Sequence, residues 1–257
     1  MPTRDGYAEG IPSWTDLSTT DVAGAKEFYT TLFGWEYSEE ETDSAPYSMA
    51  TKKGLSAAGI GELQTEGHPP VWSTYFAVSN ADATAAKVKD AGGRVLLEPF
   101  DVTDAGRMAI VSDPTGAVFG IWQAGNHFGA AIVNEHGALN WNELLTDDTE
   151  KALAFYQKVF GHEIEVSTSL TGSDYFLIKV GDRGVAGAMA KPMAEIPNHW
   201  GVYFAVDDVA KTIVQATENG GSLVHGPQEI PEVGTFAGLV DPYGSNFTVI
   251  QLASEVD

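Results

Sequence analysis

The feature that most constrains the fold of this chain is an internal repeat. Eight positions of the first half recur in the second half at an offset of 127: Trp14, Leu17, Asp21, Ala25, Phe28, Tyr29, Phe33 and Gly34 match Trp141, Leu144, Asp148, Ala152, Phe155, Tyr156, Phe160 and Gly161. From Gly59 and Gly187 onward the offset is 128, and it stays so to Gln123 and Gln251. Because a single one-residue shift aligns both copies, the chain is a tandem duplication.

The repeat divides the 257 residues into two modules. We place the first at 1–123, a linker at 124–138 and the second at 139–257. A module of about 125 residues is long enough to bury its own core. The linker is rich in Gly and Asn, and its apolar patch Ala130–Val133 is expected to pack against one module.

Each module is predicted to contain the order strand, helix and three strands twice. In the first module a strand at Ile11–Leu17 precedes a helix with Asp21 as N-cap and Gly34 as its C-terminal stop. A second strand at Trp72–Val78 precedes a helix at Ala81–Ala91. The fold class is therefore α+β, with a pair of βαβββ units in each module.

Charge and composition exclude several classes of function. The net charge of −22 argues against binding a nucleic-acid backbone and against docking on an anionic membrane. The absence of cysteine excludes disulfides, a thiolate nucleophile and sulfur-ligated metals. No apolar run has the length of a signal peptide or a membrane span, so we expect a cytoplasmic protein.

Several short motifs occur in the same order in both copies. In the first they are Phe28-Tyr29, Phe33-Gly34, Tyr75-Phe76-Ala77-Val78, Gly92-Gly93 and Asp113-Pro114-x-Gly116. This pattern resembles the vicinal oxygen chelate superfamily, which includes glyoxalase I, bleomycin-resistance and fosfomycin-resistance proteins and extradiol dioxygenases. It is most similar to the tandem glyoxalase-like proteins of actinobacteria. The resemblance implies a curved mixed sheet in each module, with the helices outside.

Enzymes of that superfamily usually hold a divalent metal with His and Glu side chains on the first, fifth and eighth strands of a module. The matching positions here are Trp14 and Trp141, Ser73 and Gly201, and Gly120 and Thr248. None of the six is a histidine or a carboxylate, which divalent metals prefer. We therefore expect neither the standard metal site nor another cofactor.

Three side chains are candidates for acid–base catalysis. Asp16 and Glu143 lie two residues beyond Trp14 and Trp141, so each shares a strand face with its tryptophan. Burial against an indole would raise the carboxyl pKa towards neutrality, as a general acid or base requires. His199 lies two residues before Gly201, where it can pair with Glu143. The alternative is that both carboxylates are structural and His199 faces solvent at a strand end.

Aromatic residues on the central strands are candidates for ligand binding. They are Trp14, Trp72, Tyr75, Trp122, Trp141, Trp200 and Tyr203. An aromatic wall with few polar groups suits an apolar or planar ligand, but a plain hydrophobic core has the same composition, and at least half of these residues are expected to be core. Arg107 is a candidate anchor for an anionic ligand in the first module only, because its counterpart is Thr235.

Two hypotheses of function remain nearly level. The first is a glyoxalase-like protein of detoxification or secondary metabolism that processes a small molecule by acid–base chemistry, as a lyase or isomerase. The second is a non-catalytic binder that sequesters a planar or aromatic metabolite or antibiotic, as bleomycin-resistance proteins do. A third is a scaffold protein that reuses the fold. The expected partner is a small molecule, and the chain is expected to be a monomer or a homodimer.

Overall fold

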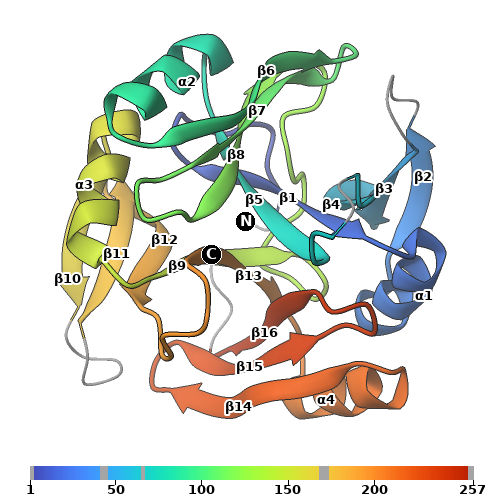
Figure 1. Ribbon diagram of the computed structural model, residues 1–257. Coiled ribbons are helices and arrows are strands. Elements are labelled where there is room, and N and C mark those ends of the chain that lie inside the picture. Colours follow the sequence, from blue (N-terminus) through green and yellow to red (C-terminus); the bar gives the residue numbers. More distant parts are fainter. Residues whose placement is uncertain (1–2, 41–45, 65–66, 168–173, 254–257) are drawn as a thin grey trace.

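The computed structural model describes residues 3–40, 46–64, 67–167 and 174–253 (Figure 1). The elements of the first module are β1 (Pro12–Thr19), α1 (Val22–Phe33), β2 (Glu36–Glu40), β3 (Tyr47–Lys52), β4 (Leu55–Glu62), β5 (Val71–Ala77), α2 (Ala81–Asp90), β6 (Arg94–Val102), β7 (Gly106–Ser112) and β8 (Val118–Ala124). Those of the second are β9 (Leu139–Thr146), α3 (Thr149–Phe160), β10 (Glu163–Ser167), β11 (Tyr175–Val180), β12 (Arg183–Ala190), β13 (His199–Ala205), α4 (Val209–Glu218), β14 (Ser222–Ile230), β15 (Gly234–Val240) and β16 (Asn246–Leu252).

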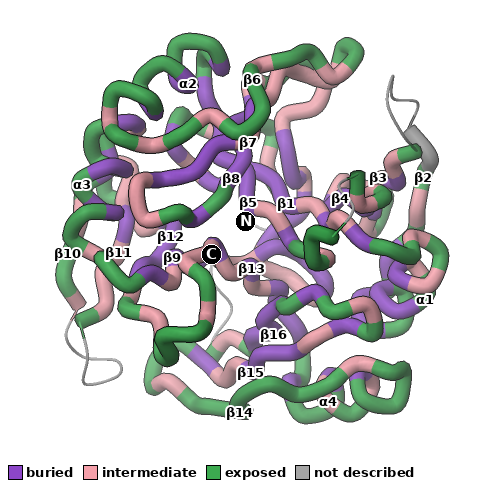
Figure 2. The backbone as a smooth tube through the Cα atoms, in the orientation of Figure 1, coloured by how far each residue is buried: buried purple, intermediate pink, exposed green. Residues whose placement is uncertain are grey.

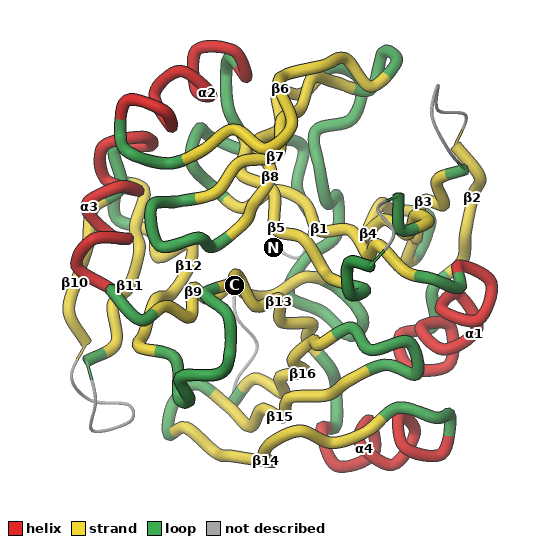
Figure 3. The backbone as a smooth tube through the Cα atoms, viewed as in Figure 1, coloured by secondary structure: helices red, strands yellow, loops and turns green. Residues whose placement is uncertain are grey.

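Each module forms one eight-stranded mixed sheet, in the orders β2-β3-β4-β1-β5-β8-β7-β6 and β10-β11-β12-β9-β13-β16-β15-β14. The first strand of each βαβββ unit pairs in parallel with the last, and the two units join through the antiparallel pair β1–β5 or β9–β13. Figure 3 shows the four helices at the outside of the two sheets. The prediction of an α+β fold with two tandem modules and curved mixed sheets is confirmed.

The helices begin and end where the sequence predicts. The side chain of Asp21 accepts a hydrogen bond from the amide of Gly24 at 3.0 Å, which satisfies one unpaired donor of the first turn. Gly34 ends α1 in the left-handed conformation, with φ at 66°. Asp148 and Gly161 repeat both caps on α3. Within the described residues, no helix is long and apolar enough to cross a bilayer.

The two large hydrophobic cores are shared between the modules. One combines α1 and the β1–β4 sheet half with α4 and strands β13, β15 and β16. The other combines α2 and the β5–β8 half with α3 and strands β9, β11 and β12. Figures 1 and 2 show α2 beside α3 and α1 beside α4, with buried chain between the sheets. Each module is long enough to bury a core of its own, yet the two large cores are built from both modules.

Matching polar relays cross both shared cores. The indole of Trp72 donates to the Tyr29 hydroxyl at 2.9 Å, and Tyr29 donates to Asp241 of the other module at 3.0 Å. In the second core Trp200 donates to Tyr156 at 2.8 Å, and Tyr156 donates to Asp113 at 3.1 Å. Buried hydroxyl and indole groups need such partners, so the Phe-Tyr and Asp-Pro motifs join the modules.

The linker lies along the start of the first sheet. Ala130 donates its amide to the carbonyl of Ser13 at 2.8 Å, and Tyr7 donates to the carbonyl of Ala130 at 2.6 Å. Ala130 and Ile132 are fully buried. The apolar patch therefore packs onto the first module, near the start of β1.

Candidate functional site: the inner faces of the two sheets

Each sheet has one face against a shared core and one face turned away from the helices. Leu17 and Leu144 point into the cores. Because side chains alternate along a strand, Asp16 and Glu143 point to the opposite, inner face, together with Trp14 and Trp141. The predicted pairing of each carboxylate with its tryptophan on one strand face follows from this register.

Asp16 is at the centre of a hydrogen-bonded cluster in the first module. Trp14 Nε1 donates to the Tyr47 hydroxyl at 3.0 Å, and Tyr47 donates to Asp16 Oδ2 at 3.4 Å. Burial raises the pKa of the Asp16 carboxyl to about 7, although hydrogen bonds from Tyr75 and Tyr47 act in the opposite direction. Asp16 as a whole residue nevertheless keeps partial exposure.

Glu143 has the same surroundings in the second module. Trp141 Nε1 donates to the Tyr175 hydroxyl at 3.1 Å, and Tyr203 donates to Glu143 Oε1 at 2.8 Å. Glu143 is 8% exposed, and its burial raises the pKa of its carboxyl above the ordinary range against the hydrogen bonds from Tyr203 and Tyr175. Each module therefore holds a tryptophan–tyrosine–carboxyl–tyrosine cluster.

Tyr47 and Tyr175 were not predicted as site residues from the sequence. They occupy equivalent positions of the two copies, at an offset of 128, and this recurrence is the sequence signal that could have identified them. Each hydroxyl lies over a glycine on the next strand: a Cβ at Gly59 would be 1.7 Å from Tyr47 Oη, and a Cβ at Gly187 would be 1.9 Å from Tyr175 Oη. These glycines leave the room that lets each hydroxyl approach its carboxylate.

Trp122 belongs to a buried aromatic cluster on the first module's inner face, which the linker residues Ala130 and Val133 also join. It packs with Trp14 and Tyr75, and all three are 6% exposed or less. Its indole donates to the carbonyl of His127 in the linker at 2.8 Å, and the His127 ring meets that of Trp14 edge-on at 4.5 Å. Partly exposed apolar side chains border this cluster, among them Met49, Met108 and Ile110.

Trp72 and Trp200 lie on the other face of the sheet. Both are buried in the shared cores, where they form the relays through Tyr29 and Tyr156. They precede the inner-face residues Ser73 and Gly201 by one position, and a shift of one position reverses the direction of a strand side chain. The structure places these two tryptophans in the core and away from any ligand on the inner face.

Arg107 is held by acidic side chains of its own module. Its guanidinium donates to Asp82 at 2.7 and 2.9 Å and to Asp101 at 2.9 Å, and it also contacts the carbonyl of Pro99. It therefore joins α2 to the β6–β7 hairpin. Asp82 and Asp101 pair with the guanidinium that was predicted to anchor an anionic ligand.

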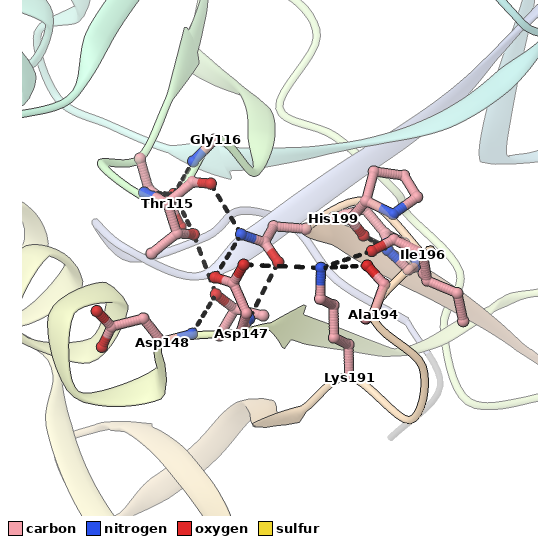
Figure 4. Close-up of polar contacts among 12 residues, drawn as sticks. Thr115, Gly116, Asp147, Asp148, Lys191, Ala194, Ile196 and His199 are labelled. Atoms are coloured by element: carbon pink, nitrogen blue, oxygen red, sulfur yellow. Dashed lines mark hydrogen bonds and ion pairs between the residues drawn. The ribbon is translucent and has the colours of Figure 1, made fainter.

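His199 lies at the edge of a polar cluster between the modules (Figure 4). Its register partner is Leu145, whereas Glu143 pairs with Gly201, and its Nδ1 is 2.8 Å from the carbonyl oxygen of Pro197. Asn198 beside it donates to the carbonyl of Thr115 at 2.8 Å and to Asp147 at 2.9 Å. The structure thus brings His199 to the inner face but not into the Glu143 cluster.

The residues on the inner faces do not suit the divalent metal that enzymes of the resembled superfamily bind. At the first-strand positions the indole nitrogens of Trp14 and Trp141 carry hydrogen and act as donors to tyrosine. A donor of this kind has no lone pair for a cation. Within the described ranges, no group of three or more His, Cys, Asp or Glu side chains is placed to hold a metal.

Comparisons with known proteins agree with this architecture. The sequence pattern of the Glyoxalase/Bleomycin resistance protein/Dioxygenase superfamily matches residues 11–121 and 138–249. A glyoxylase-like protein of Mycobacterium tuberculosis, CFP32, is 47% identical over 99% of this chain and 100% of its own length. The anthracycline biosynthesis protein DnrV of Streptomyces peucetius is 35% identical over 96% of this chain and 94% of its own.

Solved structures share the fold at low sequence identity. The Mn(II)-bound glyoxalase from Novosphingobium aromaticivorans superposes with a TM-score of 0.66 and 17% identity, over 97% of this chain and 84% of that one. At this identity the likeness concerns the fold alone.

Proposed function

Because this chain belongs to the Glyoxalase/Bleomycin resistance protein/Dioxygenase superfamily, we propose that it processes a small molecule on the inner face of its first module, with Asp16 as the group that moves a proton. The observation that carries the proposal is that the carboxyl of Asp16, a residue that keeps partial exposure, has its pKa raised by burial to about 7 and has aromatic side chains around it. The glyoxylase-like and biosynthetic relatives support the small-molecule class.

The chemistry follows from the protonation of Asp16. A general acid or base is most effective when its pKa lies near the working pH, since both forms are then populated. The ionised carboxylate accepts a proton from a carbon next to a ligand carbonyl, and the carboxylic acid returns it at another atom of the ligand. Tyr47 and Tyr75 donate hydrogen bonds to the ionised carboxylate before it takes the proton and again after the proton has left, and so hold the Asp16 side chain in place.

The second candidate function is binding without conversion. The specific observation that favours it is that the partly exposed methionines Met49 and Met108 pack against the buried aromatic cluster of Trp14, Tyr75 and Trp122 on the same face. Methionine adapts its shape to a ligand, and aromatic side chains suit a planar one. A protein of this kind would hold its ligand at Asp16 and leave it unchanged.

The test is proton exchange at carbon. A panel of α-hydroxycarbonyl compounds is incubated with the protein in D2O, and exchange next to the carbonyl is followed by NMR. We expect Asp16→Asn to lower the rate by about 100-fold or more, within the range for removal of a general acid or base. The rate of the wild type should change with an inflection near pH 7.

Glu143→Gln is the matched control, since it changes the equivalent carboxyl of the other module. We expect it to keep the wild-type exchange rate. An Asp16→Asn variant that exchanges protons as fast as the wild type would contradict the catalytic proposal. A compound that binds in an Asp16-dependent way and is never exchanged would support the second candidate.

A further inference from the structure

Two adjoining pockets lie where α2 of the first module meets α3 of the second (Figure 1). Their volumes are about 340 and 410 Å³, and Gly92 and Pro114 line both of them. The walls come from the residues that follow α2, from the start of β6, from the turn at Pro114 and from α3. We call the two pockets together the α2–α3 groove. Pockets of this size admit a small organic molecule.

Three basic side chains line the α2–α3 groove: Arg94, Lys151 and Lys158. The whole chain has only 14 Lys and Arg residues and a net charge of −22, so this grouping is unusual for it. Lys158 donates to the carbonyl of Asp90 at 2.5 Å and so satisfies the C-terminal end of α2. Within the described ranges, the side chains of Arg94 and Lys151 form no hydrogen bond or ion pair, and both residues are exposed. Their charges are therefore available to a ligand.

The rest of the lining is mostly apolar. Leu96 and Val118 are 54% and 47% exposed there, although both are large hydrophobic residues. Asp113 is the one carboxylate among the described residues of the lining, and it is 2% exposed. Its oxygens accept hydrogen bonds from the amides of its own turn and from the Tyr156 hydroxyl. The groove thus combines basic side chains with apolar surface.

The equivalent positions between α1 and α4 carry no basic side chain. There Arg94, Lys151 and Lys158 correspond to Ser222, Gly24 and Thr31. Ala154, which lines the α2–α3 groove, corresponds to Glu27. The duplication has therefore left positive charge at one helix pair and negative charge at the other.

A tyrosine covers the equivalent surface of α1. A Cβ at Gly24 would be 1.7 Å from Tyr243 Oη, so the tyrosine reaches over the first turn of the helix. Burial raises the pKa of Tyr243, and nearby carboxylates, Asp21 and Glu27 among them, act in the same direction. The residue that matches Tyr243 is Thr115, whose short side chain leaves α3 uncovered. Because the α1–α4 pair packs with this surface covered and acidic, packing of the modules does not require an open basic groove.

We propose that the α2–α3 groove binds a small organic anion with an apolar body. The anionic group pairs with the basic side chains of the groove, and the body lies against Pro114 and Leu96. Charge-assisted hydrogen bonds and the burial of apolar surface both favour such a ligand. The walls come from both modules, so the ligand joins them and stabilises the folded chain. This site shares no residue with the Asp16 cluster and does not depend on the chemistry proposed there.

The test uses 2-naphthoate, an aromatic carboxylate, and measures its affinity by equilibrium dialysis at about 0.15 M salt, where the distant charges of the chain are screened. We expect Lys151→Gln and Arg94→Gln each to weaken binding about two- to fivefold, the range of one exposed charged contact. Lys211→Gln is the matched control, because it removes the charge of an exposed lysine on α4, and it should bind as the wild type does. The uncharged 2-naphthol should bind more weakly than 2-naphthoate.

Ala154→Glu is the sharper variant, because it introduces the acidic residue of the other copy at an exposed helix position that glutamate suits. We expect it to weaken 2-naphthoate binding about tenfold or more by like-charge repulsion. Saturating 2-naphthoate should raise the melting temperature of the wild type and leave that of Ala154→Glu unchanged. Asp16→Asn should bind 2-naphthoate as the wild type does and lose proton exchange alone.

The proposal is overturned if 2-naphthoate shows no saturable binding up to its solubility limit, or if Ala154→Glu binds it as the wild type does. A loss in Lys211→Gln equal to that in Lys151→Gln would also overturn it, by assigning the binding to overall charge. A loss in Asp16→Asn equal to that in Ala154→Glu would overturn it by assigning the binding to the inner face.

Discussion

The outer and inner faces of the two sheets differ in how closely the two modules match. On the outer faces the relays from Trp72 through Tyr29 and from Trp200 through Tyr156 have the same residues and nearly the same distances. On the inner faces Asp16 is replaced by Glu143, and neighbouring residues differ, as Met108 and Phe236 do. The outer faces build cores that both modules share, so a change there disturbs both.

One part of the inner face, the cluster around the carboxyl, is nevertheless alike in the two modules. The tryptophan–tyrosine–carboxyl–tyrosine cluster is present in both modules, although burying a carboxyl destabilises a fold. The cluster faces away from the helices and is not part of either shared core. This cost is consistent with the role in proton transfer proposed for Asp16.

The largest effect is expected on the outer faces. Asp113 Oδ1 accepts hydrogen bonds from the amides of Thr115, Gly116 and Ala117, and its Oδ2 accepts the bond from Tyr156. Asp113→Ala should therefore lower the free energy of unfolding by about 3–5 kcal/mol, because it leaves buried donors without an acceptor. Chemical denaturation measures the change.

Asp241→Ala provides the matched variant in the other core, where Asp241 accepts from Tyr29, Tyr243 and Ser245. If the outer faces are equivalent, both variants lose stability to a similar extent. A loss below about 1 kcal/mol in either one would break the equivalence.

Most of the fold could be predicted from the sequence because its signals are local and occur twice. Asp21 and Gly34 mark the ends of α1 by their cap geometry, and the turn at Asp113 has its Pro and Gly in place. The sharing of cores could not be predicted, because a helix stripe such as that of Phe28 and Tyr29 indicates burial without indicating which module covers it.

The candidate site could be predicted in part. The alternation of strand side chains predicted that Asp16 shares a face with Trp14. The same rule places Trp72 and Tyr75 on opposite faces of their strand, because their positions differ by an odd number of residues. Composition alone grouped these aromatics together. The contact of Tyr47 with Asp16 depends on the register of β3 with β4 and on the space over Gly59, which no local pattern specifies.

The second-largest effect is expected in how the stability of the fold changes with pH, because the inner faces hold buried carboxyls. The pKa of Asp16 rises from 3.8 in the unfolded chain to about 7 in the fold, so the folded state holds the extra proton between these values. Stability is therefore highest below pH 3.8 as far as this group is concerned, and it falls as the pH rises towards 7. The shift corresponds to at most about 4 kcal/mol, and contact with water reduces this to roughly 2 kcal/mol.

Asp16→Asn should accordingly stabilise the fold by roughly 2 kcal/mol at pH 8 and have little effect near pH 4, because asparagine stays neutral. Denaturation curves between pH 4 and pH 8 measure this difference. Glu143→Gln should change stability in the same direction, since burial also raises the pKa of Glu143. If either variant is less stable than the wild type at pH 8, the carboxyl is ionised at little cost and the two clusters are not equivalent.

The smallest effect is expected from the tyrosines that hold the carboxyls. Tyr47→Phe removes one hydrogen bond to Asp16 and the acceptor of the Trp14 indole, so it should destabilise the fold by about 1 kcal/mol. The hydroxyl of Tyr47 lowers the pKa of Asp16, so its loss should raise that pKa further and shift the fall in stability to higher pH. Tyr175→Phe should act in the same way on Glu143. A pH profile that moves in only one of the two variants would show that the tyrosine–carboxyl contact is retained for one module's chemistry and is only structural in the other.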